Sequence, residues 1–475
     1  MPPFAGSMNP SQDSHEPKLE SNSIITINVG GQLFQTTKQT LALAGPKSFL
    51  STISDDRSFS FSSSQPHVPF FDRDPELFSI FLSLLRTGNL PSTAKAFDLQ
   101  DLIFEAHFYG IESVLLNSIS NPSQFEPFTL EKSMLLPLNG RETPSSISTT
   151  PFGSVHVAHG SKITSFDWSL TRKWTVLTRF AAVDSLVALS PVLAAAGATD
   201  FSGLQIIDLQ KGFVRKILNW DNSTKSGSTV QAIGNSNEFL FTSFESSRRN
   251  SNSVMVYDLL GDFRPVIEIA QNEIYGAEID SAVPATKLNW VSSYNLLMTS
   301  GFHSGPSGVS GNIKLWDIKS GKVAWEVKEN VDCFSDVTVS DNLSAMFKVG
   351  VNSGEVFFID LRSLSSDKSW VCLGDDRKMM NVKKEGLGCK IENHGNQVFC
   401  SKGGDLELWS EVLVDASTKT QDWLGDRVFR RNLMGKSKDR GGSKITNLSF
   451  GGNKMFITRK DEQFVEVWQS SARGF

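Results

Sequence analysis

A short pattern that recurs seven times after residue 151 constrains this chain more than any other feature. It is an apolar run that closes on an aromatic or aliphatic residue and then, in most copies, on Asp. The copies are Ile163–Asp167, Leu204–Asp208, Val254–Asp258, Ile313–Asp317, Val356–Asp360, Leu406–Ser410 and Phe464–Gln469. Their closing positions lie 41, 50, 59, 43, 50 and 59 residues apart. Recurrence in fixed order at about forty to fifty residues is typical of repeated four-stranded sheets, one sheet per copy.

A second register agrees with the first. Upstream of each of the last five copies lies a polar turn that ends in Asn and is followed at once by apolar residues: Asn237, Asn295, Asn342, Asn396 and Asn453. Asn, like Gly, tolerates the left-handed backbone that tight hairpins need. Each repeat therefore reads as strand a, Asn turn, strand b, loop, strand c closed by Asp, and strand d. Residues 143–475 are predicted to form an all-β, seven-bladed β-propeller, a scaffold whose usual activity is binding.

Six of the seven copies are followed by a candidate outer strand: Trp174–Phe180, Phe213–Trp220, Val266–Ile269, Val323–Val327, Trp370–Leu373 and Val428–Leu433. The seventh copy is not, because only seven residues follow Trp468. A ring left open there would expose a strand edge, and exposed edges promote aggregation. We therefore expect Ser133–Leu138, in the connecting segment 121–142, to supply the missing strand and close the ring. An edge strand tolerates Pro137.

The first part of the chain lacks this repeat and has a different pattern of turns and helix signals. Residues 1–22 are rich in Pro, Ser, Asn and charge and are expected to be disordered. The block 23–120 reads as α+β, because an alternating hairpin folds back at Gly30-Gly31 and a helix start follows at Asp74-Pro75. Apolar residues then repeat at helical spacing until Gly88. Two further helices are expected at Asp98–Tyr109 and Glu112–Ile119.

Four motifs of this block carry a resemblance to a known family. They are INVGGQLFQTT at 27–37, FFDRDPELF at 70–78, FLSLLRTGNL at 81–90 and EAHFYGI at 105–111. In this order they resemble the potassium-channel-tetramerisation branch of BTB/POZ domains. Together with the ring, the chain is similar to plant BTB/POZ proteins that carry a WD-repeat-like propeller. The resemblance covers nearly all of the chain beyond residue 22.

The resemblance implies a mechanism. The BTB/POZ domain would self-associate and dock cullin-3, while the propeller would hold a protein substrate for ubiquitin transfer. The candidate residues for oligomerisation or cullin docking are Asp72, Arg73, Asp74, Arg86, Phe108 and Tyr109. Two features of related domains are missing. Thr87–Lys95 lacks the apolar-x-Glu signature of cullin-binding BTB domains of other branches, and residues 22–120 contain no Cys for the inter-subunit zinc site of channels.

The charges Asp72, Arg73 and Asp74 have two interpretations. Capping and the helix dipole account for acidic residues beside a helix start. The family motif instead implies pairing across subunits. Both hold if Asp74 makes the cap and leaves Arg73 free for a neighbouring subunit.

The ring departs from typical WD-repeat proteins. Among the seven copies of the closing pattern only Trp316-Asp317 is a literal Trp-Asp pair, and no repeat opens with Gly-His. The recurrent Asp residues are therefore expected to cap tight turns through local hydrogen bonds rather than to build the family's full polar network.

The long connections of the ring predict where a partner binds. In a propeller the a–b and c–d turns lie on one rim and the d–a and b–c loops on the other. The Asn turns are short, whereas the second rim collects long segments: Asp221–Ser228, Glu245–Ser253, Gln271–Ala285, Gly301–Gly311, Asp375–Gly388 and Gly435–Ser443. They are either a recognition surface or tolerated insertions. The candidate partner-face residues are Trp220, Asp221, Arg248, Arg249, His303 and Arg377. Trp220 either anchors a partner or packs between blades.

Composition and charge argue against several classes of function. The formal charge is 46 − 51 = −5, mild and mixed in sign, so nucleic acid is not an expected partner. No apolar run reaches the ~20 residues of a membrane span, and the start lacks a signal pattern, which favours the cytoplasm or nucleus. The four Cys lack C-x-x-C spacing, and His156 and His159 read as a strand pair, so no metal or cofactor is expected. No nucleophile–base pair emerges, which argues against an enzyme.

Two functions of different classes are left. The first is a substrate adaptor of a cullin-3-based ubiquitin ligase, in which oligomerisation presents several propellers at once. The second is an oligomeric scaffold or co-regulator that acts through BTB self-association and the propeller without any cullin.

Overall fold

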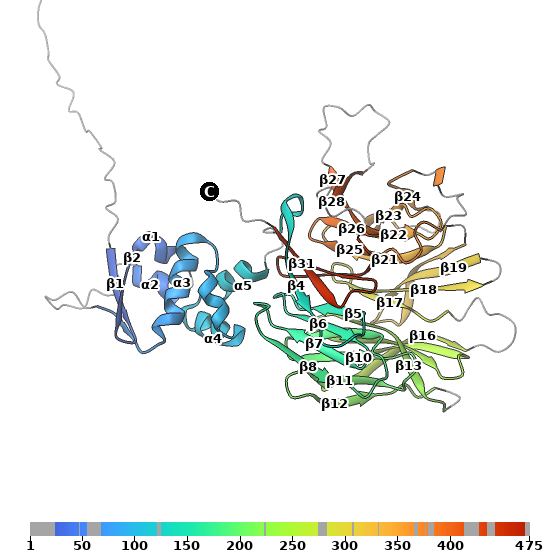
Figure 1. The fold of residues 1–475 in the computed structure, drawn as a ribbon, viewed down its shortest axis with the longest axis horizontal. Coiled ribbons are helices and arrows are strands. Elements are labelled where there is room, and N and C mark those ends of the chain that lie inside the picture. Colours follow the sequence, from blue (N-terminus) through green and yellow to red (C-terminus); the bar gives the residue numbers. More distant parts are fainter. Residues whose placement is uncertain are drawn as a thin grey trace, which may run out of the picture. The chain divides into compact units, whose positions relative to one another are not determined.

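The computed structural model describes residues 24–46, 48–54, 68–120, 125–222, 225–273, 283–305, 308–330, 332–364, 369–375, 377–378, 384–412, 427–434 and 442–470. The chain forms two compact units, one ending at Ser118 and one beginning at Ile119 (Figure 1). The predicted disordered segment 1–22 lies outside the described residues.

The first unit is α+β, as predicted. Strands β1 (Ile24–Val29) and β2 (Gln32–Thr37) form an antiparallel hairpin, and β3 (Phe70–Phe71) pairs parallel to β1. The hairpin turns at Gly30 and Gly31, which hold φ of 55° and 92°; glycine adopts this left-handed backbone without steric penalty. The helical elements are α1 Lys38–Ala42, α2 Phe49–Ser54, α3 Pro75–Thr87, η1 Ser92–Ala96, α4 Leu99–Tyr109 and α5 Glu112–Ser120.

Helix α3 begins and ends where local chemistry requires. The Asp74 carboxylate accepts from the backbone N–H groups of Glu76 (2.8 Å) and Leu77 (3.4 Å), which satisfies two donors that have no partner inside the helix. Gly88 closes the helix in the left-handed region, at φ 72°. One face of α3 is buried, and its aromatic residues pack on Tyr109 of α4. The centroid of the Tyr109 ring lies 5.2 Å from that of Phe78 and 6.1 Å from that of Phe81.

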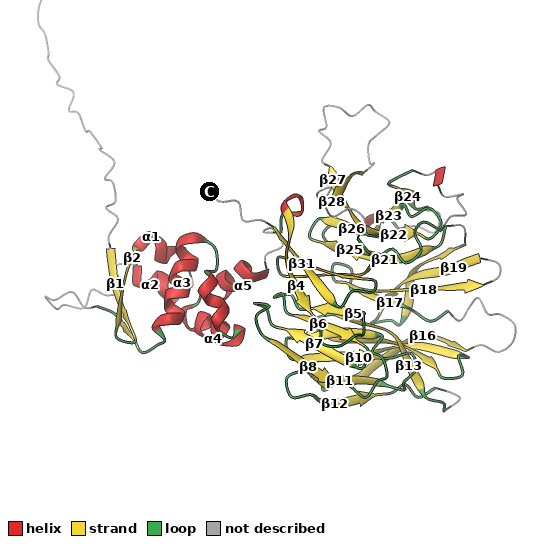
Figure 2. Ribbon diagram, viewed as in Figure 1, coloured by secondary structure: helices red, strands yellow, loops and turns green. Residues whose placement is uncertain are grey.

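The second unit contains seven four-stranded antiparallel sheets in the part of the chain that is described, which confirms the predicted propeller (Figure 2). The first four blades are β5 Pro144–Thr149, β6 Val155–His159, β7 Lys162–Phe166, β8 Lys173–Leu177; β9 Ser185–Ser190, β10 Leu193–Gly197, β11 Leu204–Asp208, β12 Phe213–Leu218; β13 Ser228–Asn235, β14 Phe239–Ser246, β15 Ser251–Asp258, β16 Arg264–Glu273; and β17 Lys287–Val291, β18 Leu296–Gly305, β19 Gly308–Asp317, β20 Lys322–Glu329. The last three are β21 Phe334–Ser340, β22 Ala345–Gly350, β23 Val356–Asp360, β24 Val371–Cys372; β25 Ile391–His394, β26 Gln397–Lys402, β27 Asp405–Val412, β28 Val428–Met434; and β29 Ile445–Gly451, β30 Lys454–Arg459, β31 Phe464–Ser470 with β4 Leu130–Pro137. Short 3-10 turns cover Pro127–Thr129 and Leu361–Ser363.

The blades close on themselves. First strands of neighbouring blades contact one another all the way round, from β5 through β29 and back to β5, so they surround the centre of the ring. Buried apolar side chains fill the space between adjacent sheets. Between the second and third blades, for example, Leu204 and Ile206 pack with Val230 and Leu240.

The turns confirm one predicted register and correct part of the other. Each Asp that closes a third strand caps the following turn: Asp167 accepts from Arg172 N at 3.0 Å, and Asp317 accepts from Lys319 N at 3.0 Å. The same local cap occurs at Asp208, Asp258 and Asp360. The left-handed residue of the Asn turns is not always Asn. It is Asn295 in the fourth blade, but Ser344, Gly395 and Gly452 in the next three.

The expected closing strand is present. The outer strand of the last blade is β4, which pairs antiparallel with β31 and places Leu136 opposite Val465. Lys132 of β4 lies 2.9 Å from the buried Glu466 carboxylate of β31, which also accepts from Arg459 Nε at 3.1 Å. Burial alone would raise the pKa of Glu466, but the hydrogen bonds from Lys132 and Arg459 outweigh it and lower that pKa. The two ends of the ring are thus joined by a ladder and by charge.

Candidate functional site

A cavity of about 530 Å³ opens where the first strands of the fourth, fifth and sixth blades converge. Its wall also includes residues of the first and seventh blades, among them Ile147 and Asn447, so the cavity lies at the ring's centre. The residues Thr286, Val351 and Leu387 place it on the rim formed by the d–a and b–c connections. We call it the channel-mouth pocket.

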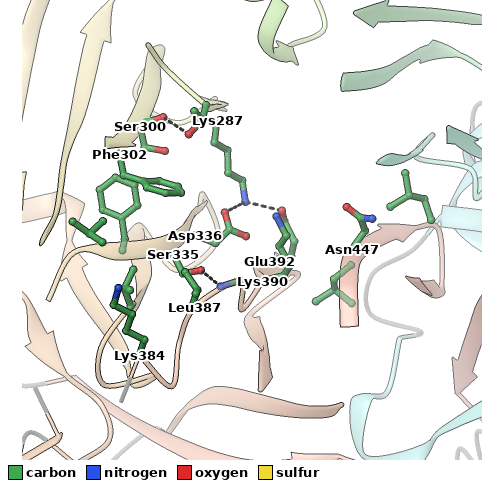
Figure 3. A pocket seen from close by; sticks show the side chains of 17 residues that line it. Lys287, Ser300, Phe302, Ser335, Asp336, Lys384, Leu387, Lys390, Glu392 and Asn447 are labelled. Atoms are coloured by element: carbon green, nitrogen blue, oxygen red, sulfur yellow. Dashed lines mark hydrogen bonds and ion pairs between the residues drawn. The ribbon is translucent and has the colours of Figure 1, made fainter. Parts of the chain in front are cut away.

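A salt-bridged cluster occupies the middle of this pocket. Lys287, the first residue of β17, extends its ammonium toward Asp336 of β21 and Glu392 of β25 (Figure 3). The Lys287 Nζ atom lies 3.0 Å from Asp336 Oδ1, 2.8 Å from Glu392 Oε1 and 3.4 Å from the carbonyl of Ile391. An ammonium has three donors, and all three are used. The cluster therefore ties three successive blades together.

The electrostatics of the cluster follow from burial and charge. Burial alone would lower the pKa of Lys287, but the carboxylates of Asp336 and Glu392 outweigh it and raise the pKa. Burial raises the pKa of Glu392, and the ammonium of Lys287 opposes this rise. The second oxygen of Asp336 accepts from the backbone of Ile391 at 3.0 Å. These groups satisfy one another and hold the inner wall in place.

Around this cluster the pocket carries an apolar wall and two further lysines. The ring of Phe302 is 38 % exposed, and its centroid lies 6.1 Å from that of the buried Phe334. Leu387 is 56 % exposed. Lys384 and Lys390 also line the pocket, and within the described ranges neither ammonium has an ion pair with a carboxylate. In the view of Figure 3, Phe302, Lys384 and Leu387 lie on the side of the pocket opposite Asn447.

The predicted partner-face residues are brought to the same rim, with one exception. Asp221, Arg248, Arg249 and Arg377 are exposed in d–a or b–c connections. Trp220 is 5 % exposed; it packs between the second and third blades and donates from Nε1 to Glu268 at 2.8 Å. Of the two interpretations of Trp220, packing between blades is confirmed and the partner anchor is wrong, because the neighbouring blade covers its ring.

Two predicted long loops are instead strand. Within Gly301–Gly311, β18 and β19 continue their ladder until Gly305 pairs with Gly308. His303 is therefore an exposed strand residue opposite Ser310. Within Glu245–Ser253 the pairing of β14 with β15 likewise runs to Glu245 and Asn252. Sequence reasoning also overlooked the long connection between β27 and β28, which joins strands c and d and so belongs to the other rim; residues 413–426 of it lie outside the described residues.

In the first unit, Arg73 was predicted to be free for a neighbouring subunit, but its side chain already has partners. Its guanidinium lies 3.5 Å from the buried Glu105 carboxylate and 3.8 Å above the centroid of the Phe108 ring. Both partners belong to the same unit: the carboxylate of Glu105 forms an ion pair with the guanidinium, and the ring of Phe108 makes a cation–π contact with it. Asp72 and Asp74 are exposed, and Asp74 makes the predicted cap.

The other predicted docking residues divide into surface and core. Arg86 is exposed and donates from Nη2 to the carbonyl of Gln35 at 2.7 Å. Phe108 is partly exposed beside Phe104, which is 67 % exposed. Tyr109 is fully buried among aromatic rings, so it cannot contact a partner. Burial is also the main reason that the pKa of Tyr109 is raised.

The channel-mouth pocket was missed by sequence reasoning, although a signal for it exists. Lys287, Asp336 and Glu392 are 49 and then 56 residues apart, close to the blade repeat, and each stands at the start of a first strand. Charged residues at equivalent inner positions of successive blades face a common channel. Reading the repeat for polar residues as well as apolar ones would have found them.

The two strand histidines behave as predicted. His156 donates to or accepts from Ser165 Oγ at 2.9 Å, and His159 pairs with Thr164 Oγ1 at 2.8 Å, both in the interior of the first blade. Among the residues that are described, no group of three His, Cys, Asp or Glu side chains could hold a metal ion. Within the same ranges, no helix has the length and apolar character needed to cross a membrane.

Comparisons with known proteins agree with the fold. Residues 139–470 match the family described as At2g24240-like, C-terminal beta propeller, and residues 25–119 match the BTB/POZ domain. The chain is 61 % identical to BTB/POZ domain-containing protein At5g41330 of Arabidopsis thaliana, over 96 % of this chain and 98 % of that protein. It is 26 % identical to BTB/POZ domain-containing protein At4g30940 of the same plant, over 95 % and 98 % of the two chains.

Two more distant relationships concern parts of the chain. Human BTB/POZ domain-containing protein KCTD9 is 37 % identical over 93 residues, which are 19 % of this chain and 23 % of that protein. A chain in the crystal structure of the mitotic checkpoint complex superposes with a TM-score of 0.50 at 11 % identity, over 73 % of this chain and 92 % of that chain; this likeness concerns the fold alone. The domains and relatives support a protein-interaction adaptor or scaffold. The chain belongs to the plant BTB/POZ domain-containing proteins that end in an At2g24240-like propeller.

Proposed function

We propose that this protein is a substrate adaptor of a cullin-3-based ubiquitin ligase. Its BTB unit self-associates and docks cullin-3, and its propeller binds the protein to be ubiquitinated. The proposal rests on the presence of two modules in one chain. One is a BTB unit similar to that of KCTD9, and the other is a closed propeller with a pocket on the rim that bears the long loops. The first module suits assembly, and the second suits recognition.

The surface of the BTB unit supports the assembly part of the proposal. Phe104 and Phe108 leave a large share of their rings in solvent on α4, and Leu33 and Phe70 are exposed on the sheet. Exposed aromatic and aliphatic side chains on so small a unit favour burial against a partner. Arg73 lies over the ring of Phe108 and adds a cation at the same place.

A second candidate is an oligomeric scaffold without cullin. The observation in its favour is the connection after α3, Thr87–Lys95, which has no Glu where cullin-binding domains of other branches carry one. The two candidates make the same prediction for self-association and opposite predictions for cullin-3.

The test is the mass in solution of residues 24–120, measured by light scattering alone and after mixing with an N-terminal cullin-3 fragment. We expect an oligomer that forms a larger complex with cullin-3. Phe104→Asp should reduce one or both assemblies, because it places a charge in an apolar surface. Gln100→Asp, which adds the same charge to an exposed site one turn earlier on α4, is the matched control and should change neither.

Each outcome decides between the candidates. An oligomer that ignores cullin-3 at micromolar concentration selects the scaffold and rejects the adaptor. A monomeric unit rejects both forms of the proposal, because neither then presents several propellers together. Loss of assembly in Gln100→Asp as well would show that charge in general, and not the aromatic surface, controls the mass.

A further inference from the structure

The channel-mouth pocket has charges of two kinds, and only one kind is available to a ligand. Lys287 spends its donors on Asp336, Glu392 and a carbonyl. The two carboxylates are occupied as well, since they also accept from backbone or hydroxyl donors. Within the described ranges neither Lys384 nor Lys390 makes an ion pair with a carboxylate, although Lys390 is close enough to Glu392 to oppose the rise that burial causes in the pKa of that group. The pocket therefore presents positive charge at its opening.

Residues 384–388, which include Lys384, are held in place by backbone hydrogen bonds. The backbone N–H of Glu385 donates to the carbonyl of Asn352 at 3.2 Å, and that of Gly386 donates to Val351 at 3.0 Å. Gly386 approaches so closely that any side chain there would collide with the carbonyl of Gly350. Only glycine permits this contact. These residues are therefore ordered before a ligand binds, so binding does not have to overcome the entropy of ordering them.

An apolar surface adjoins this positive charge. Phe302 and Leu387 each leave a third or more of their surface in solvent, and both line the pocket. The ring of the buried Phe334 packs edge-on against the ring of Phe302. Large apolar side chains exposed at the mouth of a cavity favour contact with another apolar group. A ligand that fits must therefore combine negative charge with an apolar side chain.

We propose that the channel-mouth pocket binds a short acidic and apolar peptide segment of a partner protein. A carboxylate of the segment contacts Lys384 and Lys390, and a neighbouring Leu or Phe side chain lies against Phe302 and Leu387. The proposal rests on the proposed role of the propeller in binding a protein, and it assigns the chemistry of the segment that is recognised. Charge complementarity decides for an acidic segment, because the three lysines and two carboxylates that line the pocket sum to 3 − 2 = +1, and both carboxylates already pair with Lys287.

The test uses the 475-residue chain and three pools of fluorescent octapeptides with random flanks. The central pairs are Asp-Phe, Lys-Phe and Asp-Ser, and binding is followed by fluorescence anisotropy. We expect the Asp-Phe pool to bind about tenfold more tightly than either other pool, because it alone satisfies both the lysines and the apolar wall. Its affinity should fall as salt is raised.

Variants assign the effect to the pocket. Lys384→Glu and Lys390→Glu should each weaken binding of the Asp-Phe pool about tenfold, whereas Lys384→Arg keeps it. Phe302→Ala should weaken the Asp-Phe pool and leave the Asp-Ser pool unchanged. Arg248→Glu reverses an exposed charge on the same rim outside the pocket and is the matched control. Tryptophan fluorescence confirms that each variant is folded.

Equal binding of the three pools, or full binding by both charge-reversal variants, would overturn the proposal. A loss in Arg248→Glu equal to that in Lys384→Glu would also overturn it, because general attraction of acidic peptides to the rim would then suffice. The cullin-3 measurement is separate. If the protein binds Asp-Phe peptides selectively but does not bind cullin-3, the proposed site stands and the ligase role is rejected. If it binds cullin-3 but shows no preference among the peptides, only the proposed site is rejected.

Discussion

His394 lies in an aromatic cluster that joins the sixth and seventh blades to the start of the second unit, with Phe450 stacked on its ring and Phe125 edge-on to it. Its ring centroid is 4.7 Å from that of Phe125 and 4.9 Å from that of Phe450. Nε2 is buried with no hydrogen-bond partner in the described structure. Burial lowers the pKa of His394 from 6.5 to about 4. The imidazole is therefore neutral in the folded protein and resists protonation.

This burial predicts a dependence of stability on pH. Between pH 6.5 and 4 His394 is protonated in the unfolded chain but not in the folded chain, so the free energy of unfolding falls as the pH falls. At pH 5 the loss from this residue is about 2 kcal/mol. His394→Phe keeps an aromatic ring in this cluster and cannot be protonated. It should therefore lose less stability between pH 7 and pH 5 than the natural protein does.

The measurement is urea unfolding at both pH values, followed by tryptophan fluorescence, since all ten Trp residues lie after residue 119. His303→Gln, at an exposed site, is the control and should keep the original dependence. An equal loss in His394→Phe and the natural protein would show that His394 is not responsible.

At the scale of elements, strand β4 decides whether the ring is closed. Its ladder with β31 supplies the outer edge of the last blade. Leu136 of β4 is 4 % exposed and packs with Val155, Phe456 and Val465, whereas its neighbour Leu135 points outward and is 50 % exposed. Adjacent residues of one strand face opposite sides of the sheet. The two leucines therefore form a matched pair for mutation.

Leu136→Asp should destabilise the propeller by at least about 3 kcal/mol, because it removes a core side chain and buries a charge without a partner. Leu135→Asp places the same charge in solvent and should change stability by less than about 1 kcal/mol. The midpoint of urea unfolding, read from tryptophan fluorescence, distinguishes the two. Similar effects of both substitutions would mean that β4 does not anchor the ring.

At the scale of the whole molecule, the two compact units have separate cores. The core of the first unit gathers around Tyr109 and α3, and that of the second is divided among the spaces between blades. Units with separate cores unfold as separate transitions, so a single free energy of unfolding does not describe the chain.

Calorimetry of the 475-residue chain should show two transitions. Cutting the chain between residues 120 and 125 should give two fragments, each of which reproduces one of them. The fragment from residue 125 keeps Phe125 and β4, which the ring needs. A single transition in the intact chain, or a fragment that fails to fold, would contradict independence of the two units.

Local patterns in the sequence were enough to predict the repeated strands of the ring and helices α3, α4 and α5, in their order. The repeated closing pattern, which ends on Asp in five of its seven copies, located the third strand of every blade, because a turn cap and an apolar run are set by neighbours in the chain. Asp74, Pro75 and Gly88 fixed the bounds of α3 for the same reason. The missing outer strand of the last blade was also within reach, since a propeller cannot leave an edge open.

Which residues of these elements are exposed, and which of them meet, follows from long-range packing. Trp220 is covered by a neighbouring blade, and Arg73 is neutralised by a carboxylate 32 residues away, which no local pattern shows. Lys287, Asp336 and Glu392 look ordinary in their own strands. They become one cluster only because closure of the ring turns three first strands toward a common centre. Burial and pairing are properties of distant residues meeting, so they exist only in the folded chain.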